Sequence, residues 1–121
     1  MVSALSGASA VVCGAFGAHA LETIVGPDGV ASWKTASEYH LLHSAVLLAL
    51  ALFSAHSRQP ITLPASLFAA GIALFSGSIY LLVLVGWRWL GPITPLGGLC
   101  LIAGWLALLP LAGRFQKRTV P

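Results

Sequence analysis

Four polar side chains stand out in an otherwise apolar sequence, and they form two pairs. His19 and Glu22 end the stretch GAFGAHALE, and His40 and His43 lie in EYHLLHS a short distance further on. The members of each pair are three residues apart, so they share one face of a helix. Imidazole nitrogens and a carboxylate are ligands for zinc, copper or iron. A His-x-x-Glu pair facing a His-x-x-His pair therefore resembles the geometry of a di-metal helix bundle.

Two other uses of these four residues stay open. Ionisable groups inside membrane proteins often mark proton or ligand pathways. Histidines near a membrane surface also form hydrogen bonds between helices, which fixes how the helices pair. The residue types alone do not choose among a transition-metal site, proton or ligand handling, and simple helix pairing, although pairing without any cofactor is the plainest reading.

The composition requires a lipid environment for these residues. The chain is 58% hydrophobic and 7% charged, whereas soluble domains carry about 25% charged residues. Its net charge of +3 does not indicate a nucleic-acid partner, because the basic residues form no patch. Cys13 and Cys100 lie in apolar runs without metal-ligand spacing, and we expect both to act as small apolar side chains. The lipid bilayer is thus the first predicted partner.

Four apolar runs are long enough to cross a bilayer. Each has about 17 to 23 residues, which as a helix matches the hydrocarbon thickness. The backbone must satisfy its own hydrogen bonds in lipid, so we expect helices over about residues 2–21, 32–56, 61–85 and 92–113. Short loops after the second and third runs force antiparallel neighbours. The prediction is an all-α, integral membrane, antiparallel four-helix bundle with up-down-up-down topology, in one domain over residues 1–121.

The first connection is the only long one. Gly26 and Pro27 give a turn signal, and we expect the second helix to begin between Asp28 and Thr35, with its first turns in the membrane interface. Residues 18–20 read Ala-His-Ala, like a signal-peptide cleavage site, but no Lys or Arg precedes the run. We therefore expect no cleavage there.

The distribution of basic residues predicts the orientation. In an up-down-up-down chain, four lie on the side of the termini, namely Arg58, Arg114, Lys117 and Arg118, and two on the other, Lys34 and Arg88. Lys and Arg favour the cytoplasmic side. We expect a bacterial inner-membrane protein with both termini in the cytoplasm, and a C-terminal tail that touches anionic lipid head groups.

The tryptophans divide in the same way. Trp33, Trp87 and Trp89 fall on the outer side, where they predict an interfacial aromatic belt, and Trp105 is expected to face lipid or a groove nearer the inner leaflet. Arg88, between two of them, is placed to pair with Glu22 or Glu38.

Small residues recur at spacings of four and three, which keeps one stripe facing a partner helix. In the third run the stripe passes through Ser66, Ala70, Ala73 and Gly77. The glycines expected at helix contacts are Gly7, Gly14, Gly17, Gly77, Gly97, Gly98 and Gly104.

Four motifs in order, GAFGAHALE, WKTASEYHLLHS, LFSGSIYLL and GPITPLGGL, resemble those of the YgdD-like family of small bacterial membrane proteins. That family has a mitochondrial transmembrane relative in animals and carries a domain of unknown function. The resemblance covers nearly the whole chain and implies a four-helix inner-membrane protein. It implies no activity, although its motifs contain the same polar residues His19, His40 and His43.

The function expected from the sequence is therefore structural. We expect a non-enzymatic packing or accessory subunit, as a homo-oligomer or within a larger membrane complex, because the short loops leave almost no soluble surface for a site. A metal or redox role for His19, Glu22, His40 and His43 is the first alternative. Transport or handling of a lipid or small molecule is the second.

Overall fold

A computed structural model describes residues 1–119 of the chain, and over that range it contains helices and no strands. Four helical segments are long and apolar enough to cross a membrane. Their elements, in chain order, are α1 (Val2–His19), the 3₁₀ turn η1 (Leu21–Thr23), α2 (Pro27–Ser57), α3 (Thr62–Ile72), the π-helical segment η2 (Ala73–Gly77), α4 (Ser78–Val85), the 3₁₀ turn η3 (Arg88–Leu90), α5 (Ile93–Leu106) and α6 (Leu109–Thr119).

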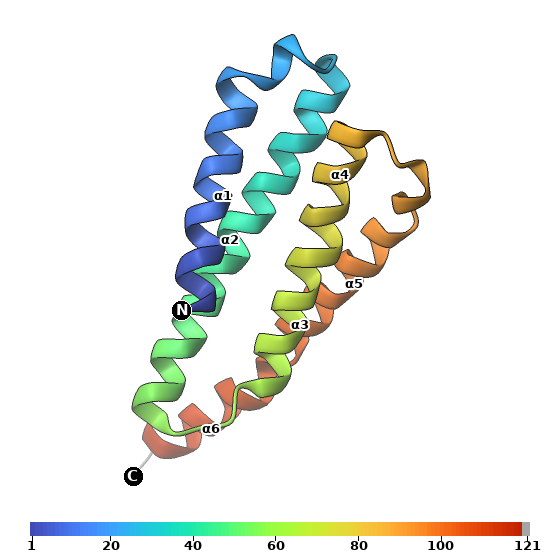
Figure 1. The fold of residues 1–121 in the computed structure, drawn as a ribbon. Helices are drawn as coiled ribbons and strands as arrows, with labels where there is room; N and C mark the ends of the chain where they lie inside the picture. Colours follow the sequence, from blue (N-terminus) through green and yellow to red (C-terminus); the bar gives the residue numbers. More distant parts are fainter. Residues whose placement is uncertain (120–121) are drawn as a thin grey trace.

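The four spans alternate in direction. In Figure 1, α1 rises, α2 descends, α3 and α4 rise as one continuous helix, and α5 and α6 descend. The predicted all-α, up-down-up-down membrane bundle is confirmed.

The second helix begins earlier than expected. Gly26 has an extended backbone at the N-cap and Pro27 occupies the first helical position. Proline suits this position because its missing N–H would have no partner there. The helix therefore has 31 residues, a length of about 46 Å, and it extends well beyond the hydrocarbon thickness of about 30 Å.

The third and fourth spans are less regular than expected. A π-helical segment, Ala73–Gly77, interrupts the third span between α3 and α4. The fourth ends its first helix at Leu106 and resumes at Leu109, just before Pro110. Proline cannot continue the hydrogen-bond ladder of the turn before it, so a single helix over 92–113 was wrong at its end.

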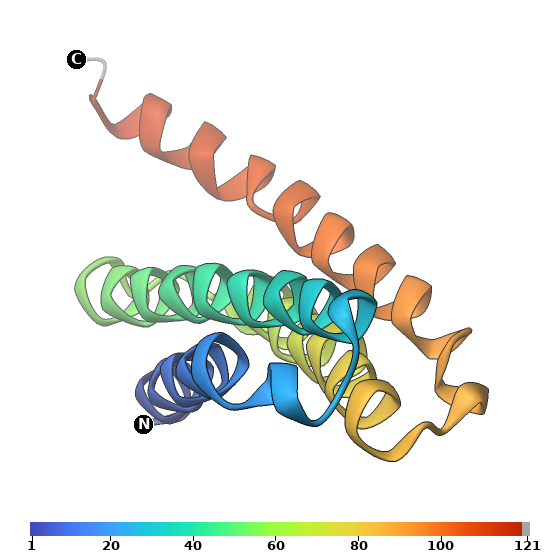
Figure 2. The same cartoon turned by 90° about the horizontal axis from the view of Figure 1, so that it is seen from above.

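The helices are arranged around α2. Seen from above in Figure 2, α1 lies beside α2, while the α3–α4 helix lies on another side of it and α5 packs against that helix. Leu47 and Leu50 of α2 form the buried apolar cluster together with Phe68 of α3 and Leu101 of α5. Because α1 packs almost entirely on α2, the array is open on one side rather than a closed square of helices.

The Phe68 ring of α3 and the backbone of η2 sit over glycines of α5. Added side-chain carbons would come within 2.9 Å of the Phe68 ring at Gly104, and within 2.7 Å of the Phe75 backbone at Gly97. The reverse arrangement occurs at Gly71, which faces Leu101. Ser66, Ala70 and Ala73 are exposed instead. The stripe predicted for this helix was therefore on the wrong face, because the contact with α5 uses the Phe68 ring, the backbone at Leu74 and Phe75, and Gly71.

The remaining glycines differ in how closely they are packed. Gly17 of α1 lies against the Trp33 indole, where an added carbon would be 2.9 Å from Nε1. Gly7, Gly14 and Gly98 leave room for ordinary contact at 3.9 Å. Gly77 has no neighbouring atom within 4 Å of an added carbon, so its expected role as a packing glycine is not supported.

Trp33 is not part of an interfacial belt. Its side chain is 4% exposed, and its indole donates a hydrogen bond to the Cys13 carbonyl at 2.7 Å. It therefore fastens α2 to α1, whereas Trp87 and Trp89 stack on each other and stay exposed.

Candidate functional site

The four residues proposed as one cluster separate into two levels. His19 ends α1 and Glu22 lies in η1, and both are exposed. His40 and His43 lie inside α2 and are 8% and 3% exposed. His40 faces Ser6 and Ser9 of α1, and Ser9 lies ten residues before His19, which is about 15 Å along the helix. The prediction of a single His/Glu cluster at one depth was wrong, because α2 begins well outside the membrane.

His40 links three helices through its two ring nitrogens. Nδ1 lies 3.2 Å from the Tyr80 hydroxyl of α4. Nε2 lies 3.2 Å from the Ser6 hydroxyl of α1 and 3.5 Å from that of Ser9. Ser6 in turn lies 2.6 Å from Ser44 of α2. One imidazole thus joins α1, α2 and α4 in the interior.

The donor and acceptor of each of these hydrogen bonds can be assigned by starting from Ser44. The Ser44 hydroxyl donates to the His40 carbonyl at 2.7 Å, so it can only accept from Ser6. The single proton of Ser6 is then used, and Ser6 accepts from Nε2–H of His40. In a neutral imidazole the other nitrogen is an acceptor, so the Tyr80 hydroxyl donates to Nδ1. The geometry defines the neutral Nε2–H tautomer of His40.

His43 joins α2 to α5 and adopts the opposite tautomer. Its Nδ1 lies 2.7 Å from the Tyr39 carbonyl, and a carbonyl only accepts, so Nδ1 carries the proton. Its Nε2 accepts from the Trp105 indole N–H at 3.2 Å, because an indole N–H only donates. Phe68 and Trp105 pack on the ring of His43. Trp105, expected to face lipid or a groove, is half-exposed and also donates a hydrogen bond to a buried histidine.

Two serines make the remaining links, one within the π-helical segment and one directly after it. Ser76 donates to the Ala36 carbonyl of α2 at 2.7 Å, and Ser78 lies 2.6 Å from the Thr94 hydroxyl of α5. The bulge thus lets nearby residues of one helix reach two different partners. These hydrogen bonds join the third span to α2 and to α5, which gives the π-bulge a structural role.

The charged residues are outside this interior network. Glu38 pairs with Lys34 one turn away at 3.9 Å, and within residues 1–119 Arg88 forms no ion pair with Glu22 or Glu38. The described residues contain no group of three or more His, Cys, Asp or Glu side chains arranged to hold a metal ion. They also contain no buried side-chain nitrogen or oxygen without a hydrogen-bond partner.

Sequence reasoning missed some members of the network. Ser6 and Ser9 are three residues apart in an apolar helix, a spacing that places two hydroxyls on one face. Because a hydroxyl in lipid needs a partner, this pair was a usable signal. Gly71, which contacts Leu101, was missed because it lies outside the stripe predicted for its helix.

The fold and its interior define a class: a small four-helix membrane protein with two buried histidines hydrogen-bonded between helices. Comparison with known proteins gives the family. Residues 13–98 match the family described as "Protein of unknown function (DUF423)", and the chain belongs to that family.

Relatives occur in bacteria and yeast. The chain is 36% identical to a UPF0382 membrane protein of Staphylococcus aureus over 95% of this chain and 94% of the relative. It is 35% identical to the UPF0382 membrane protein YwdK of Bacillus subtilis over 95% of each chain. It is 40% identical to a UPF0382 membrane protein of Schizosaccharomyces pombe, over 89% of this chain and 95% of the relative. No solved structure matches. The predicted membership in a small membrane family of unknown function is confirmed.

Proposed function

We propose that this membrane protein is a non-enzymatic packing subunit, which associates through its α1–α2 surface with a transmembrane helix of a second copy or of a larger membrane complex. No resident cofactor is needed for that role. The interior polar groups support the proposal because they are used in hydrogen bonds within the chain, which leaves them for helix pairing rather than chemistry.

One surface carries the proposal. Two adjoining hollows of about 490 and 330 Å³ lie along α1 and α2 and share Val11 and Leu41. We call them together the α1–α2 groove, lined on α1 by Ala4, Ala8, Val11, Ala15 and Ala18. These five residues repeat at spacings of four and three, the pattern that lets a second helix approach closely. The groove runs for about 20 Å, which is most of a bilayer crossing.

The experiment isolates the protein in native lipid particles and measures its mass. The expected result is an assembly larger than the 12.5-kDa monomer. Ala8→Phe and Ala15→Phe fill the groove and should release the monomer. Val12→Phe, on an exposed part of α1 that does not line the groove, is the matched control and should leave the assembly intact. A wild-type protein that migrates only as a lone monomer would contradict the proposal.

The same proposal includes an orientation. Arg58, Arg114 and Lys117 are exposed at the end of the array that carries the C-terminus, which favours cytoplasmic termini in the bacterial inner membrane. A reporter active only in the cytoplasm, fused to the C-terminus, tests this orientation, and activity of a periplasm-only reporter there would reverse it.

A further inference from the structure

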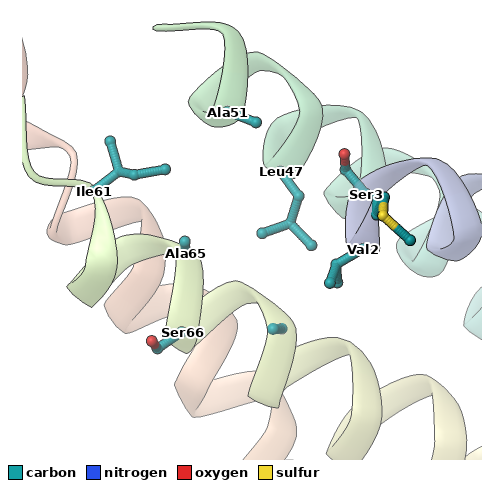
Figure 3. Close-up of a pocket in the computed structure, with 9 residues that line it drawn as sticks. Val2, Ser3, Leu47, Ala51, Ile61, Ala65 and Ser66 are labelled. Carbon is teal, nitrogen blue, oxygen red and sulfur yellow. The ribbon is translucent and has the colours of Figure 1, made fainter. Parts of the chain in front are cut away.

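A third hollow lies at the N-terminal end of α1, where the array is open, and it meets the α1–α2 groove at Ser3. Figure 3 shows it between the start of α1, the second half of α2 and the first half of α3. We call it the α1–α3 groove. It measures about 400 Å³ and is lined by Val2, Ser3, Leu47, Ala51, Ile61 and Ala65, among others. It forms because α1 begins beside Leu47, while α2 continues for ten residues to Ser57.

The size and lining of this groove favour a lipid chain over a helix. The lining of this groove runs along α3 only from Ile61 to Ala69, about 12 Å, so the groove is too short for a transmembrane partner. Its walls are mostly aliphatic side chains, which give water few hydrogen-bond partners. In a bilayer, a flexible acyl chain is the available molecule that fits such a space.

The end of the groove carries positive charge. Ile61 lines the groove, and two residues before it Gln59 accepts a hydrogen bond from the Arg114 guanidinium at 3.2 Å. Arg58 caps α2 in the same connection and is exposed. Non-helical backbone lies outside the hydrocarbon when it faces lipid, so residues 58–61 mark the membrane surface. Both arginines therefore lie at head-group depth, Arg58 within the connection that leads to Ile61 of the groove and Arg114 hydrogen-bonded to that connection.

We propose that the α1–α3 groove holds one acyl chain of an anionic phospholipid, whose phosphate is bound by Arg58 and Arg114. This inference goes beyond the packing role and does not depend on it, because the two grooves share only Ser3 and the residues changed to fill each groove line only that one. Guanidinium groups suit phosphate because they present several donors in one plane.

The test measures lipid retention. Protein is reconstituted in vesicles of equal parts phosphatidylglycerol and phosphatidylcholine, extracted in mild detergent, and examined by native mass spectrometry. The expected result is one retained phosphatidylglycerol per chain. Arg58→Gln and Arg114→Gln should each lower its enrichment over phosphatidylcholine about fivefold. Arg88→Gln, at the opposite end of the array, is the matched charge control and should not change it.

The groove itself is tested by filling it. Ala51→Phe and Ala69→Phe enter the groove and should abolish retention of both lipids, whereas Ala49→Phe and Ala70→Phe lie on the same helices outside its lining and should not. Each groove variant has its control on the same helix, Ala49 on α2 and Ala70 on α3. If one groove variant fails to fold, the variant on the other helix still tests the groove. Retention unchanged in both groove variants, equal retention of the two lipids, or a groove occupied by a second copy instead of lipid would each overturn the proposal.

Discussion

The indole N–H of Trp105 donates to Nε2 of His43 at 3.2 Å, and this bond joins α5 to the middle of α2. It involves a buried acceptor and a half-exposed donor, so the donor can be removed with little loss of buried apolar area.

Trp105→Phe should lower the free energy of unfolding by about 0.6 to 2 kcal/mol, the range for hydrogen bonds between membrane helices. The physical reason is that Nε2 of His43 loses its donor while it stays buried. Unfolding by increasing denaturing detergent in mixed micelles measures the effect. Trp89→Phe, whose side chain is 64% exposed, should leave the midpoint unchanged, and equal shifts for both variants would contradict the assignment.

Ser6 and Tyr80 should be energetically coupled although they lie on opposite sides of the His40 ring. Ser6→Ala and Tyr80→Phe remove the acceptor and the donor of one directed chain of hydrogen bonds. A double-mutant cycle should give a coupling on the order of 0.5 kcal/mol or more. Ser6 and Trp105 belong to two separate hydrogen-bond networks, through His40 and His43 respectively. The effects of Ser6→Ala and Trp105→Phe on stability should therefore add within about 0.5 kcal/mol. Additive effects in the first cycle would argue against the chain through His40.

Gly97→Ala and Gly77→Ala should separate the two kinds of glycine. At Gly97 an added carbon would come within 2.6 Å of the Leu74 backbone carbon, so the helices must move apart. Overpacking of this kind costs about 1 to 3 kcal/mol. Gly77 faces open space, and alanine there should be neutral or favourable by up to about 1 kcal/mol. Thermal unfolding in detergent compares the two, and a tolerated Gly97→Ala would contradict the packing.

Gly104→Ala should be destabilising and should be rescued by a smaller neighbour. The added carbon would lie 2.9 to 3.1 Å from three atoms of the Phe68 ring. Phe68→Leu removes the flat ring and should recover part of the loss in the double variant, even though Phe68→Leu alone leaves unfilled space. Effects that simply add would show that the two side chains do not share one contact.

Metal content provides a separate measurement. The separation of His19 from His40 predicts that purified protein holds only substoichiometric zinc, copper or iron by elemental analysis. His40→Ala and His43→Ala should leave that content unchanged. One equivalent of metal that is lost in these two variants would support a metal site after all. Its ligand set would then differ from the predicted set of His19, Glu22, His40 and His43.

The sequence predicted the spans and their alternation because lipid imposes strong limits on length, composition and backbone bonding. It also singled out His40 and His43, since imidazoles are rare in so apolar a chain. It did not predict their depth, because that depends on where α2 begins. Pro27 opens that helix, and a turn signal and a helix start look alike at Gly-Pro.

The small-residue pattern also did not predict which face of α3 contacts α5. Small residues usually mark helix contacts in membranes, but here the Phe68 ring and the backbone at Phe75 pack over glycines that belong to α5. Which of two packed helices supplies the large residue and which supplies the glycine depends on both helices together. The periodicity of one helix, considered alone, does not contain that information.

The attachment of α1 almost entirely to α2 has a consequence for how the protein assembles. The His43–Trp105 and Ser78–Thr94 bonds connect the other three spans without any help from α1. Those spans therefore hold a cohesive unit of their own, and we expect α1 to be the layer that docks last and detaches first. An α1 segment donated by a neighbouring molecule would recover the same Ser6 and Trp33 bonds, so exchange of this layer between two copies costs little in contacts.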